Sequence, residues 1–124
     1  MTSISTELAP AAIGPYSQAR RSVGLLFVSG QLPIDPSTGT FNSVEPAIQV
    51  TQCLQNIAAI ASAAGTDIKR TVKTTVFLTD LKKFAAVNEA YSTFFVEPFP
   101  ARACVEVSAL PRGAAVEVEA IIEL

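Results

Sequence analysis

Two predicted strands near the C-terminus carry the side chains best suited to chemistry. Because side chains two residues apart share a face of a strand, one face presents Arg102, Cys104, Glu106 and Ser108 on the first strand and Glu117, Glu119 and Ile121 on the second. Arginine offers a planar fork that binds a carboxylate through two hydrogen bonds, and a glutamate can orient or deprotonate water. The pattern indicates either a polar cleft covered by a second subunit or a solvent-exposed face with arginine–glutamate pairs, and it leaves both open.

The absence of histidine from the sequence narrows the chemistry further. It excludes Ser-His-Asp and Cys-His nucleophiles, zincin-type metal sites and imidazole acid–base catalysis. Cys53 and Cys104 form no metal-type pair, and we expect both to be free thiols, with Cys53 in the core. The glycines form neither a dinucleotide-binding motif nor a P-loop. Any reaction must therefore use carboxylate, guanidinium, hydroxyl, thiol, lysine or backbone groups, and we expect no metal.

Length, composition and charge limit the possible partners. The chain has 124 residues, 49% hydrophobic and 16% charged, which predicts a single domain spanning residues 1–124. So large an apolar share also indicates that another subunit covers part of the surface. A net charge of −2 without a basic run argues against binding to nucleic acid or to an anionic membrane. No stretch approaches the roughly 20 apolar residues that span a bilayer, and residues 1–10 resemble no secretory signal, so we expect a cytoplasmic protein.

The order of the predicted elements indicates an α+β fold. The strands are predicted at residues 17–23, 25–31, 71–79, 101–110 and 115–122, and the helices at residues 43–65 and 81–95. Ser43 is the expected N-cap of the first helix and Gly65 its C-terminal stop. The order β-β-α-β-α-β-β predicts two helices on one face of a mixed sheet. The face beneath the helices is predicted to consist of Ala103, Val105, Val107 and Ala109 on one strand and Val116, Val118, Ala120 and Ile122 on the next.

Four motifs then resemble, in order and at compatible spacing, those of the RidA family, the reactive intermediate (enamine/imine) deaminases. They are residues 9–18 (APAAIGPYSQ), 27–33 (FVSGQLP), 72–88 (VKTTVFLTDLKKFAAVN) and 100–121, which begins PARACVEV. The resemblance covers nearly the whole chain, which makes it specific. Two departures are a connection at residues 95–100 that is shorter than in many members and Ala103 in place of a frequent serine.

The resemblance implies a chorismate-mutase-like fold and a homotrimer whose sheets form a central barrel, with ligand clefts between subunits. It also implies a hydrolase that converts 2-imino acids and their enamines, such as 2-iminobutanoate and 2-iminopropanoate, to 2-oxo acids and ammonia without a cofactor. By motif position, Arg102 would bind the substrate carboxylate and Glu117 would act on water. The remaining binding residues would be Tyr16, Ser29, Gly30, Asn88 and Cys104.

Other interpretations stay open at this point. Arg102 could be a salt-bridge partner of Glu106 or Glu119, Glu117 could merely pair with Arg102, and Asn88 could cap a backbone group. The protein could instead bind a small carboxylate without turnover, or act as a chaperone-like interaction protein. A translation inhibitor or endoribonuclease, also a family label, is opposed by the negative charge and by the lack of histidine.

Overall fold

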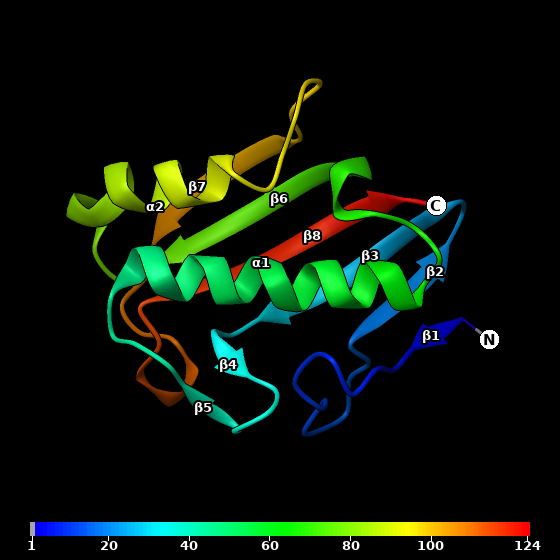
Figure 1. Ribbon diagram of the computed structural model, residues 1–124, viewed down its shortest axis with the longest axis horizontal. Helices are drawn as coiled ribbons and strands as arrows, with labels where there is room; N and C mark the ends of the chain where they lie inside the picture. The colour runs from blue at the N-terminus through cyan, green and yellow to red at the C-terminus, as the bar shows by residue number, and fades with distance from the viewer. Residues whose placement is uncertain (1) are drawn as a thin grey trace.

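The computed structural model describes residues 2–124 and has a six-stranded mixed sheet with two helices across one face (Figure 1). The sheet order is β1 (Ser3–Ile4), β2 (Ala19–Ser22), β3 (Leu25–Gln31), β8 (Val116–Glu123), β6 (Thr71–Leu78) and β7 (Ala101–Glu106). All neighbours are antiparallel except β6 and β7, which are parallel. The helices are α1 (Pro46–Ala63) and α2 (Phe84–Ser92), so the predicted α+β arrangement is confirmed.

The core lies between α1 and the centre of the sheet. In β8, the central strand, the predicted inward residues Val116, Val118 and Ile122 are fully buried. Val50 and Leu54 on α1 are equally buried and belong to the same cluster. Apolar residues recur at intervals of three and four along α1, and this spacing gives the helix one buried face.

The C-terminal end of α1 agrees with the prediction, whereas its N-cap is a different residue from the one predicted. Its N-cap is Glu45, and Ser43 lies outside the helix, where its Oγ accepts a hydrogen bond from the Glu45 amide at 3.0 Å. At the other end Gly65 adopts a φ of +84°, and the Thr66 amide donates to the Ala61 carbonyl at 3.0 Å. This is a Schellman termination, as predicted for Gly65.

The remaining elements are short. β2 and β3 lie at the two strands predicted for residues 17–23 and 25–31 and form a hairpin, whose turn places Val23 at φ 48° and Gly24 at φ 78°. The second predicted helix is divided into a 3₁₀ turn at Leu81–Lys83 and α2, and it ends before residue 95. The sequence did not predict β1 or the small ribbon of β4 (Ile34–Asp35) and β5 (Thr40–Phe41). A further 3₁₀ turn lies at Ile68–Arg70 and another at Pro111–Gly113.

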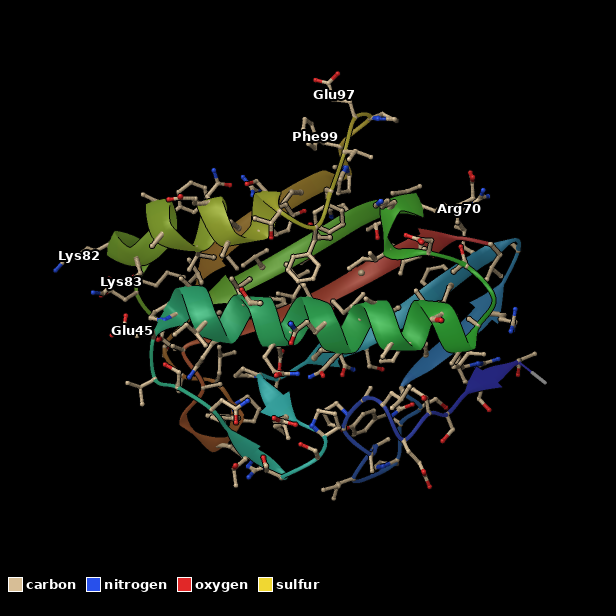
Figure 2. The ribbon with its side chains drawn as sticks, in the orientation of Figure 1. Glu45, Arg70, Lys82, Lys83, Glu97 and Phe99 are labelled. Atoms are coloured by element: carbon tan, nitrogen blue, oxygen red, sulfur yellow. The ribbon has the colours of Figure 1, made fainter. Side chains whose placement is uncertain are left out.

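The loop between α2 and β7 projects from the body of the protein. Figure 2 shows Glu97 and Phe99 at its tip, and Phe99 is 59% exposed. Within residues 2–124, neither helix is long and apolar enough to cross a bilayer.

The predicted orientation of β7 was wrong. In the parallel register Thr74 pairs with Arg102, and Val76 pairs with Cys104. Thr74 and Val76 are buried under the helices, so Arg102, Cys104 and Glu106 face α2, opposite to the prediction. The physical reason is that β7 is an edge strand: Val105, expected in the core, is 40% exposed on the open face. Residues 107–110, included in the predicted strand, lie beyond its end.

Candidate functional site

A β-bulge in β3 shapes the first group of candidate residues. Val28 pairs with Ala120 and Gln31 with Val118, so Ser29 and Gly30 together stand opposite the single residue Glu119. Bulges of this kind redirect side chains and backbone groups, and they are common beside active sites. Here the bulge brings Gly30 against the side chain of Glu117 on β8.

Glu117 lies directly over Gly30 because glycine has no side chain. A Cβ atom at Gly30 would be 2.9 Å from the Glu117 Oε1 and 3.0 Å from its Cδ. The pKa of the half-buried Glu117 carboxyl is raised, first by loss of solvation and then by repulsion from Glu119. A raised pKa brings a carboxylate nearer to the range in which it can accept a proton from water.

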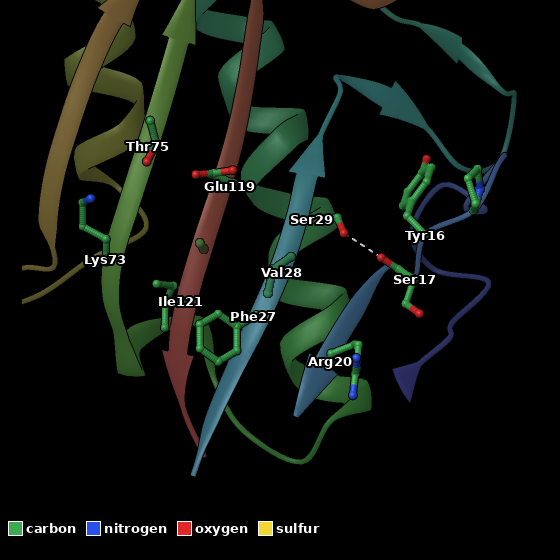
Figure 3. Close-up of a pocket in the computed structure, with 12 residues that line it drawn as sticks. Tyr16, Ser17, Arg20, Phe27, Val28, Ser29, Lys73, Thr75, Glu119 and Ile121 are labelled. Atoms are coloured by element: carbon green, nitrogen blue, oxygen red, sulfur yellow. Dashed lines mark hydrogen bonds between the residues drawn. The ribbon is translucent and has the colours of Figure 1, made fainter. Parts of the chain in front are cut away.

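Tyr16 and Ser29 complete this group. With Gly30 and Glu117 they line a cavity of about 720 Å³, and Arg112 is also among its lining residues. Ser29 Oγ donates to the Ser17 carbonyl at 2.6 Å, and Figure 3 shows this bond beside the ring of Tyr16. Glu117, Gly30, Ser29 and Tyr16 are hereafter called the carboxylate cluster.

The second group lies on the helix side of the sheet. The Arg102 Nη1 donates to the Asn88 Oδ1 at 2.7 Å. The Arg102 Cζ lies 4.8 Å from the centre of the Tyr91 ring and 5.4 Å from that of Phe84, within range of cation–π attraction. The Arg102 side chain remains exposed, so donors other than the one engaged by Asn88 can reach a ligand. Arg102, Asn88 and Cys104 are hereafter called the arginine cluster.

Cys104 is in the arginine cluster but is not activated. Burial raises the pKa of the Cys104 thiol, and the nearby positive charge of Arg102 only partly opposes that effect. A thiol whose pKa lies above its ordinary value is a poor nucleophile at neutral pH. This agrees with a role in lining a site rather than in covalent catalysis. Cys53 is fully buried in the core, as predicted.

The two clusters occupy opposite faces of one sheet. Glu117 alternates with the buried Val116 and Val118 and so points away from the helices, whereas Arg102 points toward α2. The seven predicted site residues thus fall into two clusters, and within one chain these clusters lie on opposite faces of the sheet and do not form one site. Among residues 2–124 the one ion pair within 4 Å is Arg70–Glu123, so Arg102 is not a salt-bridge partner of Glu106, Glu117 or Glu119 within the chain.

Sequence reasoning overlooked two kinds of supporting residue. Phe84 and Tyr91 belong to the apolar stripe of α2, and their spacing around Asn88 places all three residues on one helical face. Gln18 was noted only as part of a motif. Its buried amide group bonds to the backbone of Thr6 and Pro10 and thereby holds the N-terminal segment beside the carboxylate cluster. Within the described part of the chain, no group of three metal-ligating side chains occurs.

Known proteins resemble this chain over almost its full length. The family model described as Endoribonuclease L-PSP matches residues 6–124. The RutC family protein y4sK of Sinorhizobium fredii is 64% identical over 121 residues, which cover 98% of this chain and 96% of that protein. The 2-iminobutanoate/2-iminopropanoate deaminase of Salmonella typhimurium is 49% identical over 121 residues, covering 95% and 94%.

A solved structure agrees with these relatives. Escherichia coli TdcF with bound serine has a TM-score of 0.93 and 39% identity, and the match covers 100% of this chain and 99% of that one. The chain belongs to the Endoribonuclease L-PSP family, and the resemblance to RidA proteins is confirmed.

Proposed function

We propose that this protein hydrolyses reactive 2-imino acids and their enamine tautomers to 2-oxo acids and ammonia. One observation carries the proposal: each chain bears an exposed arginine suited to a carboxylate on one face and a half-buried glutamate with a raised pKa on the other. The Salmonella typhimurium relative named 2-iminobutanoate/2-iminopropanoate deaminase supports the same reaction, with those two imines as substrates.

The proposed reaction needs positioning more than a strong nucleophile. Arg102 binds the substrate carboxylate and so fixes the adjacent C=N carbon. Glu117 accepts a proton from water while the water oxygen bonds to that carbon, and it returns this proton to the imine nitrogen to give a carbinolamine. Glu117 then moves the hydroxyl proton of the carbinolamine to the nitrogen, so that the C=O bond forms, the C–N bond breaks and ammonia leaves. The scheme uses no cofactor or metal, and Tyr16, Ser29 and the Gly30 backbone supply polar contacts.

We further propose that the two clusters meet between subunits of a homotrimer with a chorismate-mutase-like barrel. The open face of the sheet supports a covering partner, because Phe27 is 41% exposed there and pairs with Ile121. Mixing Arg102→Ala chains with Glu117→Gln chains, each strongly impaired alone, tests the composite site. After subunit exchange, about a quarter of the interfaces should carry both native residues and recover activity. If exchanged mixtures stay inactive, the site is not shared between chains.

The reaction is tested with imino acid generated in situ by an amino acid oxidase or by a pyridoxal-phosphate-dependent dehydratase. Catalytic amounts of the wild-type protein should accelerate the decay of the imine to 2-oxo acid and ammonia, whereas Arg102→Ala should not. Equal rates for wild type and Arg102→Ala would contradict the mechanism. We also propose a cytoplasmic location, because both cysteines are free thiols.

The second candidate function is binding of a small carboxylate without turnover, including a chaperone-like or sensing role. The serine bound to Escherichia coli TdcF favours it, because serine is a small carboxylate. Saturable binding of 2-oxobutanoate with no effect on imine decay would identify this function. The endoribonuclease named in the family description is opposed by the net charge of −2.

A further inference from the structure

The arginine cluster is in contact with side chains that are not among the candidate functional residues. On one face of α2, Phe84 and Tyr91 flank Asn88, and the Arg102 guanidinium lies over both rings and bonds to the amide between them. The helix therefore contacts the arginine through three side chains on one face.

Tyr91 is itself held by the strand next to Arg102. Its hydroxyl shares a 2.7 Å hydrogen bond with Thr74 Oγ1, and the two residues are 7% and 1% exposed. Thr74 is the residue on β6 that pairs with Arg102 on β7. The ring is thus tied to the strand neighbour of the arginine that it supports. Tyr91 also packs against Phe95, with 4.7 Å between ring centres.

We infer that Tyr91 and Thr74 are positioning residues that set the orientation of Arg102 for binding a substrate carboxylate. Their hydrogen bond fixes the plane of the Tyr91 ring, and the ring fixes the plane of the guanidinium. Bidentate binding depends on that plane, since the fork and the carboxylate must be coplanar. Burial raises the pKa of Tyr91, so the phenol stays neutral to a higher pH than that of an exposed tyrosine.

Thr74→Val and Tyr91→Phe each remove the hydrogen bond while keeping the side-chain shape, and Tyr91→Leu removes the ring. Thr71→Val is a matched control: it lies on the same strand, is buried, and loses a hydroxyl bond to the Ile68 carbonyl instead. Thr74→Ser retains the hydroxyl and should restore wild-type behaviour.

The inference rests on the proposed function only where KM and kcat are measured. Binding of 2-oxobutanoate, the product, is measured separately by calorimetry and does not require turnover. Thr74→Val and Tyr91→Phe should raise both KM and the Kd for 2-oxobutanoate about threefold, with kcat within about twofold. Tyr91→Leu should raise them about tenfold, because the cation–π contact is lost as well. Thr71→Val should lower thermal stability and leave both constants unchanged. The Tyr91→Phe/Thr74→Val double variant should have the same KM and Kd as either single variant, because both substitutions remove the same hydrogen bond.

Unchanged KM and Kd in folded Thr74→Val and Tyr91→Leu, with binding abolished by Arg102→Ala, would overturn the inference. An equal rise in Thr71→Val would overturn it too, because the effect would then be general destabilisation. If the wild type does not accelerate imine decay but Kd responds as expected, the proposed function fails and the inference stands.

Discussion

Replacing Gly30 by alanine should separate catalysis from folding, because the space above Gly30 is filled by the Glu117 side chain. The new Cβ would lie 2.9 Å from Oε1, 3.0 Å from Cδ and 3.4 Å from Cγ of Glu117. Ordinary contacts between carbon atoms are about 3.5–4.0 Å, so the carboxylate must retreat by roughly 0.5–1 Å.

A displacement of that size has a calculable consequence for the reaction. Misplacing a reacting group by about 1 Å costs about a hundredfold in rate, so kcat/KM should fall about 10- to 100-fold. That loss corresponds to about 1.4–2.7 kcal/mol of transition-state stabilisation. The free energy of unfolding should change by less than about 1 kcal/mol, because a flexible side chain can move and alanine restricts the unfolded chain more than glycine does.

The assay is imine decay, with urea denaturation of the same preparations. Glu117→Gln supplies the control: if Gly30 acts only by making room for the carboxylate, Gly30→Ala/Glu117→Gln should be no slower than Glu117→Gln alone. Full activity in Gly30→Ala would refute the reasoning. A double variant slower than Glu117→Gln by the whole Gly30→Ala factor would show that Gly30 contributes through its own backbone.

Four further predictions concern Glu117, Asn56 and Val23. Because the pKa of Glu117 is raised, its base form is lost as the pH falls through a value above 4.5, so kcat/KM should decline there in the wild type and Glu117→Gln should lack that limb. The same shift means that the folded state holds the Glu117 proton more tightly than the unfolded state. Glu117→Gln should therefore raise Tm at pH 7 and not at pH 4. Asn56→Ala should cost about 2–4 kcal/mol in urea denaturation, since the buried amide donates to the Leu32 and Ile34 carbonyls, and the partly buried Gln52→Ala should cost less. Val23→Asn should raise stability by about 1 kcal/mol without changing activity, because the 88% exposed Val23 is held at φ 48° in a turn that suits asparagine.

The buried face of β8 could be predicted because that strand has neighbours on both sides and α1 above it. Alternation then separates Val116 and Val118 from Glu117 without ambiguity. The same rule failed for β7, an edge strand on which Arg102 lies under α2 and Val105 is 40% exposed. At an edge, alternation identifies two faces but not which one a helix covers.

The sequence predicted which residues form the candidate site but only part of their arrangement in space. Motif positions identified Gly30 and Glu117, but the bulge that brings them together depends on register, which one strand's sequence does not specify. Tyr91 lies in the core, as expected of an apolar residue on a covering helix, yet its ring also supports Arg102. When one residue both packs in the core and positions another side chain, the hydrophobic pattern of the sequence indicates only the packing.

Placement of the two clusters on opposite faces has a consequence for assembly. If the arginine cluster of one copy meets the carboxylate cluster of the next, the joined surfaces are unlike, and the contact is heterologous rather than self-complementary. Heterologous contacts either close into a ring or continue as a filament. In a closed ring every copy completes one site and leaves no unmatched half, whereas an open pair leaves one half idle at each end. Ring closure would then give one complete site per chain. Dilution that opens the ring would lower the activity per chain before any chain unfolds.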